Sequence, residues 1–136
     1  MKTIKILIVE DDNSYSKLLQ TAFTAEGFTV VAAEDGNAAL RCLAAETVDL
    51  ILSDVQMPNL DGYEFIHELK ENSTYKSIPV VMFTASTASS KDEFWARELG
   101  ATAFIRKPPH YKEIVNKVNE ILKAGNSADR KSNRLW

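Results

Sequence analysis

Hydrophobic residues along this chain follow two alternating patterns. Five short runs are almost wholly apolar, which is typical of strands buried on both faces of a parallel sheet. Between them lie stretches in which apolar residues recur every three or four positions, the spacing of an amphipathic helix. The pattern predicts strands at residues 4–9, 28–33, 49–54, 80–83 and 103–105, and helices at about 13–26, 38–45, 63–71, 91–99 and 111–124.

Five strands alternating with five helices imply right-handed crossovers and a parallel sheet covered on both faces. We therefore predict an α/β fold with a doubly wound five-stranded sheet of the flavodoxin-like order 2-1-3-4-5. Residues 1–124 form the predicted domain, and residues 125–136 are expected to be a flexible polar tail.

Local signals mark the first helix. Asn13 or Ser14 is expected to cap it, and Gly27 is expected to stop it. Its predicted inward stripe is spaced three and four residues apart and comprises Tyr15, Leu18, Leu19, Ala22 and Phe23.

Polar and charged residues gather where the predicted strands end. Glu10-Asp11-Asp12 follows the first strand, and Asp54 ends the third. Thr84 follows the fourth strand and Lys107 the fifth. In a doubly wound sheet ligands bind outside the carboxyl ends of the strands. We therefore expect these groups to line one crevice, although an Asp that only caps a turn is the alternative for Asp54.

Clustered carboxylates repel one another, and a divalent cation removes that penalty. Oxygen ligands suit Mg²⁺, with Mn²⁺ possible. A carboxylate can attack phosphorus to give an aspartyl-phosphate, and the phosphoryl oxygens then need positive charge and hydrogen-bond donors. Lys107 can supply the charge, the Thr84 hydroxyl and the Ala85 backbone N–H can donate, and the Gln56 backbone carbonyl can bind the metal. For Asp12 the first turn of a helix is the preferred place over a metal site.

Composition narrows the setting. The formal net charge of −3 gives no general attraction to nucleic acid or anionic membrane. The single Cys42 rules out an intramolecular disulfide. No apolar run approaches the roughly 20 residues that span a bilayer, and the N-terminus shows no signal-peptide pattern. We therefore expect a cytoplasmic protein without membrane insertion or direct nucleic-acid binding.

The chain resembles the receiver domain of two-component response regulators over about residues 3–124, most of all the single-domain, chemotaxis-regulator-like kind. The matching pieces are Ile6 to Asp11, Asp54 with Met57-Pro58 and Asp61-Gly62, Thr84-Ala85, and Lys107-Pro108. Each piece is common alone, but their order at successive strand ends is specific.

The resemblance implies that Asp54 accepts a phosphoryl group from a phosphohistidine on a sensor histidine kinase or a histidine phosphotransfer protein. It implies that Glu10 and Asp11 hold Mg²⁺ with Asp54 and the Gln56 carbonyl, Asp11 directly and Glu10 through water. It also implies a frequently cis bond between Lys107 and Pro108.

The resemblance further implies a switch. The phosphoryl group draws the Thr84 hydroxyl inward, and Phe104, where the family more often has Tyr, turns from exposed to buried. The implied partner face is built from the fourth helix, fifth strand and fifth helix, with Phe94, Trp95, Phe104 and Tyr111. Because helical neighbours lie about 100° apart, we expect Phe94 and Trp95 to differ in depth.

These features predict a signalling switch and not an enzyme. The alternative is a Mg²⁺-dependent phosphatase with Asp54 as nucleophile, but such enzymes need an acid two residues later, where this chain has Gln56. A flavin-binding carrier is disfavoured because Glu10-Asp11-Asp12 would repel the flavin phosphate. A diffusible messenger, a phosphorelay intermediate and a part of a longer protein all stay open.

Overall fold

Strands and helices alternate along the whole chain in the computed structural model, which describes residues 3–57, 59–84, 89–107 and 110–124. The bounds lie within two residues of those predicted. The elements are β1 (Lys5–Val9), α1 (Asn13–Ala25), β2 (Thr29–Ala33), α2 (Gly36–Ala45), β3 (Leu50–Asp54), α3 (Gly62–Glu71), β4 (Val80–Thr84), α4 (Ser90–Glu98), β5 (Ala103–Arg106) and α5 (Lys112–Ala124).

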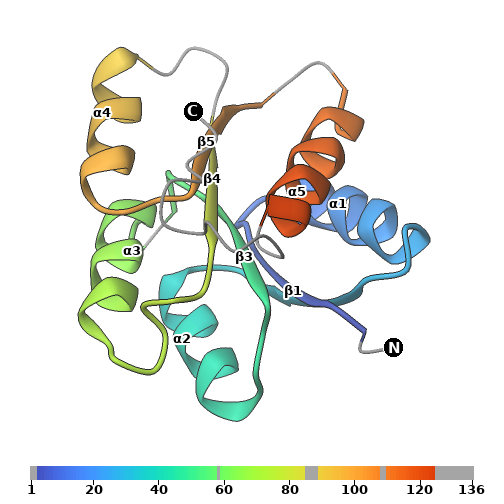
Figure 1. Cartoon of the computed structure of the whole chain (residues 1–136), viewed down its shortest axis with the longest axis horizontal. Coiled ribbons are helices and arrows are strands. Elements are labelled where there is room, and N and C mark those ends of the chain that lie inside the picture. The colour runs from blue at the N-terminus through green and yellow to red at the C-terminus, as the bar shows by residue number, and fades with distance from the viewer. Residues whose placement is uncertain (1–2, 58, 85–88, 108–109, 125–136) are drawn as a thin grey trace.

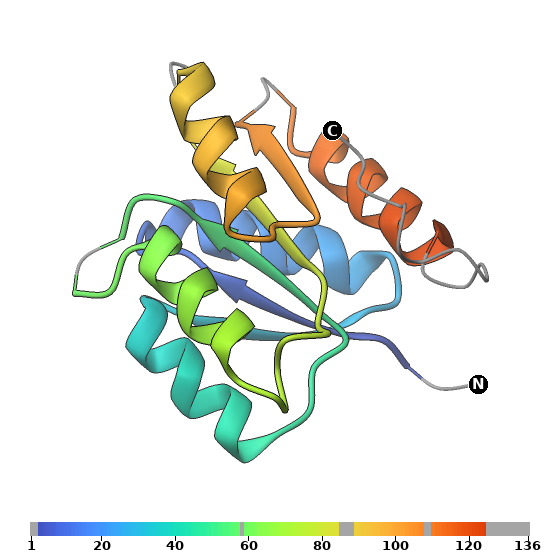
Figure 2. The ribbon, with the colours of Figure 1, turned by 60° about the vertical axis from the view of Figure 1, so that its left-hand side comes forward.

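The sheet has the predicted order β2-β1-β3-β4-β5, and all four strand pairs are parallel. The helices α1 and α5 cover one face, and α2, α3 and α4 cover the other (Figures 1 and 2). This three-layer arrangement is the doubly wound, flavodoxin-like fold. It leaves the carboxyl ends of β1 and β3 as neighbours, because the two strands pair from Ile6 with Leu50 to Val9 with Ser53.

Two cores form because successive strand residues point to opposite faces. One core joins the sheet to α2, α3 and α4, and its members include Leu7, Val9, Ile51, Val80, Met82, Phe65, Ile66, Leu69 and Ala96. The other joins the sheet to α1 and α5, and its members include Ile6, Ile8, Leu50, Leu52, Val81, Phe83, Phe23, Ile114 and Val118. Burial on both faces explains why the central strands read as unbroken apolar runs.

The start of α1 differs from the prediction. Asp12, and neither Asn13 nor Ser14, is the N-cap, because its backbone is extended and its carboxylate accepts a hydrogen bond from the Tyr15 backbone N–H at 3.1 Å. The predicted inward position of Leu18 is also wrong, since that side chain is 42% exposed. The buried stripe of α1 is Ser16, Leu19 and Phe23.

The expectation that Phe94 and Trp95 differ in depth is wrong, because each is 54% exposed. The inward side of α4 carries the fully buried Ala96, with Leu99 packed against the same core just after the helix. Both aromatic side chains lie outside that stripe. Their rings contact each other edge to face, with centroids 5.6 Å apart and an interplanar angle of 78°.

No helix in the described parts of the chain combines the length and the apolar character needed to cross a membrane.

Candidate functional site

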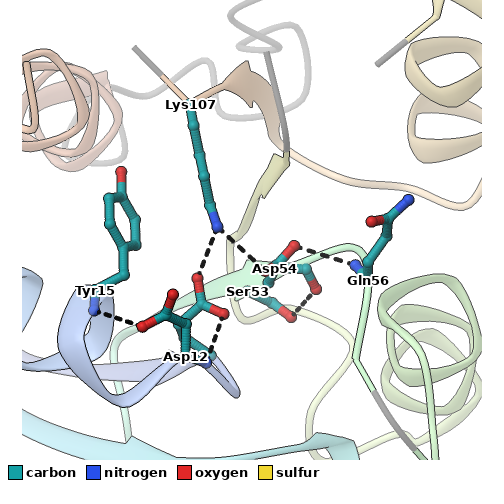
Figure 3. Close-up of polar contacts among 7 residues, drawn as sticks. Asp12, Tyr15, Ser53, Asp54, Gln56 and Lys107 are labelled. Carbon is teal, nitrogen blue, oxygen red and sulfur yellow. Dashed lines mark hydrogen bonds and ion pairs between the residues drawn. The ribbon is translucent and has the colours of Figure 1, made fainter. Parts of the chain in front are cut away.

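Four strand ends deliver the groups of the candidate site. Glu10 follows β1, Asp54 and Thr84 are the last residues of β3 and β4, and Lys107 follows β5. Figure 3 shows the side chain of Lys107 reaching down from the end of β5 toward Asp54. Parallel strands place all these ends at one edge of the sheet, so groups about 100 residues apart in sequence meet there, as the 97-residue separation of Glu10 and Lys107 shows.

Three carboxylates form the acidic part of the site. Glu10, Asp11 and Asp54 each offer an oxygen within 4.8 Å of the other two. Glu10 is 2% and Asp54 5% exposed, whereas Asp11 faces solvent. These ligands are all oxygen atoms, two on buried residues and one on an exposed residue. Such a set fits Mg²⁺, which keeps several waters when it binds through a few carboxylates. The residues present therefore fit the predicted metal.

Lys107 supplies the positive charge. Its Nζ lies 2.9 Å from Glu10 Oε1 and 3.5 Å from Asp54 Oδ2. Its backbone N–H donates to the Thr84 carbonyl at 2.6 Å, which fixes the chain at the end of β4. Burial disfavours the ammonium, but the hydrogen bond to Glu10 and the charges of Asp54 and Glu10 outweigh it, so the pKa of Lys107 is raised.

Glu10 is the most perturbed carboxyl of the site. Burial, followed by the hydrogen bond and the charge of Asp54, raises its pKa from 4.5 to about 7, against the opposing effect of Lys107. Its Oε2 also accepts a hydrogen bond from the Asp12 backbone N–H at 3.2 Å. Burial beside Asp54 therefore makes the charged form of Glu10 unfavourable, and a bound cation would relieve that penalty.

Asp54 is held in place by its own surroundings. Its Oδ1 accepts a hydrogen bond from the Gln56 backbone N–H at 3.1 Å, and its carbonyl accepts one from the buried Ser53 hydroxyl at 2.9 Å. A Cβ at Gly62 would lie 2.5 Å from the Asp54 carbonyl oxygen and 2.7 Å from Val55 Cα. Gly62 thus lets the start of α3 approach the end of β3.

The remaining predicted residues take varied places. Thr84 is 2% exposed. Phe104 is 8% exposed in the core beneath α4, with the Arg106 guanidinium 5.6 Å from its ring centroid. The exposed starting position that the resemblance implied for Phe104 is therefore wrong for this structure, which carries no phosphoryl group. Tyr111 is partly buried against the opposite core. The predicted roles of the Ala85 backbone N–H and of the Lys107–Pro108 bond lie outside the described residues, as does the tail from residue 125.

An open cleft of about 480 Å³ adjoins the site. It is lined by Asp11, Val55, Gln56, Met57, Asp61, Tyr63 and Asp92. At its far wall the Tyr63 hydroxyl donates to Asp92 Oδ1 at 2.9 Å, and Asp92 forms a capping box with Ser89 at the start of α4. Of the three clustered acids, Asp11 lines this cleft.

Sequence patterns missed two contacts that position the site. The Tyr15 ring, predicted only as a core position, lies with its centroid 4.6 Å from Lys107 Nζ. Asn59, at a left-handed φ of 68°, donates to Asp35 Oδ2 at 3.0 Å and ties the loop after β3 to the start of α2. The Asn-Leu-Asp-Gly turn signal after Pro58 marked the loop but gave no sign of its partner.

A family model described as the response regulator receiver domain matches residues 6–119. The transcriptional regulatory protein CpxR of Escherichia coli strain K12 is 36% identical over 129 residues, which are 95% of this chain and 53% of that protein. The probable transcriptional regulator ycf27 of Guillardia theta is 36% identical over 124 residues, or 91% of this chain and 47% of that protein. The chain thus spans about half the length of these curated relatives.

Solved structures show the same similarity. The chemotaxis protein CheY4 of Vibrio cholerae superposes with a TM-score of 0.81 at 28% identity, covering 88% of this chain and 98% of that one. The receiver domain of a signal transduction histidine kinase from Syntrophus aciditrophicus gives a TM-score of 0.82 at 30% identity, covering 98% and 100%. Since the family model covers most of the sequence, the chain belongs to the response regulator receiver domains of two-component systems.

Proposed function

We propose that this receiver domain takes a phosphoryl group from a partner's phosphohistidine onto Asp54. The observation that carries the proposal is the pairing of a nearly buried carboxylate with a cation, Asp54 Oδ2 and Lys107 Nζ at 3.5 Å, beside two further acids. Such a site binds a phosphoryl group between a nucleophile and a fixed positive charge. The histidine kinase or histidine phosphotransfer protein is the predicted donor.

In the transfer, a carboxylate oxygen of Asp54 attacks phosphorus. The new P–O bond forms as the P–N bond breaks, and the electron pair of that bond stays on the imidazole nitrogen. The hydrogen bond from the Gln56 N–H orients the carboxylate, and the Lys107 ammonium stabilises charge on the phosphoryl oxygens. The open cleft beside Asp11 and Gln56 gives the incoming imidazole a path.

Mg²⁺ is the proposed cofactor, with Mn²⁺ as a substitute. Glu10, Asp11, Asp54 and the Gln56 carbonyl would hold it, with Asp11 directly bound and Glu10 acting through water. When bound, it neutralises the acids and the phosphoryl oxygens. The close approach of three carboxylate oxygens and the raised pKa of Glu10 support this assignment.

Hydrolytic turnover is the competing function, and Gln56 argues against it. The amide stands two residues after Asp54, is exposed, and cannot donate and recover a proton as a carboxyl can. A persistent phospho-aspartate suits a switch better than a phosphatase. We therefore propose that self-catalysed phosphotransfer and slow autodephosphorylation are the chemistry of this domain.

The proposed output is a change at the face of α4, β5 and α5. Thr84 ends β4 beside the site. The neighbouring strand β5 pairs with β4, Phe104 opposite Met82 and Arg106 opposite Thr84. A displacement of Thr84 can therefore change the position of β5. The exposed Phe94–Trp95 pair supports a partner surface on α4.

A phosphoryl mimic is expected to shift Thr84 and Phe104 side-chain NMR signals together. Unchanged Phe104 signals would argue against the switch.

The test of the phosphoacceptor is phosphorylation by a small phosphodonor with Mg²⁺, followed by intact-protein mass spectrometry. The wild type should gain one phosphoryl group and Asp54→Asn none. Asp49→Asn is the matched control, because it removes a carboxylate just before the opposite end of β3, where Asp49 accepts from the Lys5 N–H. Undiminished modification of Asp54→Asn would refute the assignment.

A further inference from the structure

Lys107 contacts two aromatic rings as well as its two carboxylate partners. Its Nζ lies 4.6 Å from the Tyr15 ring centroid and 5.5 Å from that of Phe83. The two rings in turn contact each other at 6.0 Å with a tilt of 37°. An ammonium within about 6 Å of a ring face is attracted to its quadrupole. Glu10 and Asp54 therefore hold the ammonium together with a wall of two rings.

Tyr15 is itself fixed to the acidic cluster through the backbone. Its N–H donates to the carboxylate of the N-cap Asp12, and the Asp12 N–H donates to Glu10 Oε2. The start of α1 thus sets the ring and the carboxylate partner of Lys107 in one rigid unit. The 13-residue helix behind it keeps that unit in place.

The hydroxyl of Tyr15 shows which part of the side chain matters. Its oxygen is buried and has no hydrogen-bond partner among the described residues. In Figure 3 the ring lies alongside the Lys107 side chain, and the hydroxyl is at the end remote from Asp54. A buried, unpaired hydroxyl is unfavourable, so the contact that Tyr15 contributes to the site is that of its ring.

We propose that Tyr15 is a positioning residue that holds the Lys107 ammonium against the phosphoryl-binding position by means of its ring. When a phosphoryl group on Asp54 draws Lys107 away from Glu10, the ring keeps the ammonium from swinging out to solvent through its partly exposed path, since the Lys107 side chain is 29% exposed. The inference rests on the proposed function of Asp54 and Lys107 and adds a residue from α1 to it.

The test compares Tyr15→Phe, which keeps the ring, with Tyr15→Leu, which keeps apolar bulk and loses the quadrupole. The rate of Asp54 phosphorylation by a small phosphodonor is expected to be retained in Tyr15→Phe and to fall about threefold to tenfold in Tyr15→Leu. Tyr75→Leu is the matched control, because Tyr75 packs against the core on the other face of the sheet, and it should leave the rate unchanged.

A double-mutant cycle separates positioning from general packing. In a Lys107→Ala background, Tyr15→Leu should lower the remaining rate no further, because its target is gone. An equal fall with and without Lys107 would overturn the proposal, as would a wild-type rate in Tyr15→Leu.

Ring-current shifts give a readout that does not depend on activity. The Lys107 side-chain protons nearest the ammonium should be shifted upfield in wild type and Tyr15→Phe. The upfield shift should decrease in Tyr15→Leu to the smaller contribution of the Phe83 ring, which remains in place. Tyr15→Met serves in place of Tyr15→Leu should the leucine variant not fold. Equal shifts in all variants would overturn the inference while leaving the phosphoacceptor intact. Phosphorylation that persists in Asp54→Asn would instead refute the proposed function itself.

Discussion

Adjacent carboxylates take different tasks at the end of β1. Asp11 reaches the oxygen cluster with Glu10 and Asp54, whereas Asp12 turns to the backbone of α1 and accepts from the Tyr15 N–H. Because Asp11 and Asp12 are adjacent, the sequence alone does not indicate which of the two carboxylates joins the oxygen cluster. Because only one of the two points at the proposed cation, charge-matched substitutions can distinguish them.

Asp11→Asn is expected to weaken Mg²⁺ binding at least tenfold, the equivalent of about 1.4 kcal/mol. Asp12→Asn removes the same charge but keeps an N-cap oxygen, so it should weaken binding much less. Calorimetric Mg²⁺ titration of the two variants measures the difference. Equal losses would mean that charge alone, and not coordination by Asp11, controls the affinity.

Glu10 makes the stability of the metal-free domain depend on pH. Its folded pKa of about 7 lies above its ordinary 4.5, so between these values the folded state binds more protons than the unfolded state. Stability from this group is therefore fully present below about pH 4.5 and is lost as the pH rises toward 7. The cause is chiefly the burial of a carboxylate beside Asp54.

We expect the unfolding free energy of the metal-free wild type to fall more steeply from pH 4.5 to 7 than that of Glu10→Gln, which cannot titrate. Saturating Mg²⁺ should reduce the fall, because the cation replaces the proton in relieving repulsion. Denaturant unfolding at a series of pH values gives both curves. Parallel curves for wild type and variant would contradict the raised pKa.

At the scale of the elements, the first turn of α3 is packed on the end of β3. The Gly62 N–H donates to the Val55 carbonyl at 2.8 Å, and Asp61 caps the helix by accepting from the Glu64 N–H. The loop between them is tied to α2 through Asn59 and Asp35. The position of Asp54 therefore depends on how closely two helices approach the sheet edge.

Gly62→Ala is expected to destabilise the domain by about 1–3 kcal/mol or more, because its Cβ would meet the Asp54 and Val55 backbone. Gly36→Ala is the matched control at the first residue of α2, where the closest atom belongs to the flexible Leu60 side chain. Denaturant unfolding compares the two. If Gly62→Ala lowers the free energy of unfolding no more than Gly36→Ala does, then β3 and α3 can move apart at little cost.

At the scale of the whole molecule, the order of the sheet and the meeting of Asp54 with Lys107 at one edge were predictable. Unbroken apolar runs such as Leu50–Leu52 signal strands buried on both faces, and alternation with helices leaves few topologies. Once the strand order is set, Asp54 and Lys107 must share an edge. The pattern therefore predicts both the fold and which charged groups meet at the strand ends.

Contacts between side chains of distant elements were not predictable. Tyr15 fits an inward helical stripe equally well whether its ring meets apolar atoms or Lys107. Asn59 reads as a turn residue whether or not it reaches Asp35. Likewise Phe94 and Trp95 share one exposure because the inward side of α4 is narrow, which depends on where the helix sits on the sheet.

The central claim is that one cation and one phosphoryl group bind among acids gathered from separate strands. A crystal structure with Mn²⁺ and a beryllofluoride phosphoryl mimic tests it most directly. We predict an anomalous peak between Asp11 and Asp54, with the mimic on Asp54 and in contact with Lys107. An anomalous peak elsewhere on the domain, or a mimic bound away from Asp54, would contradict the account.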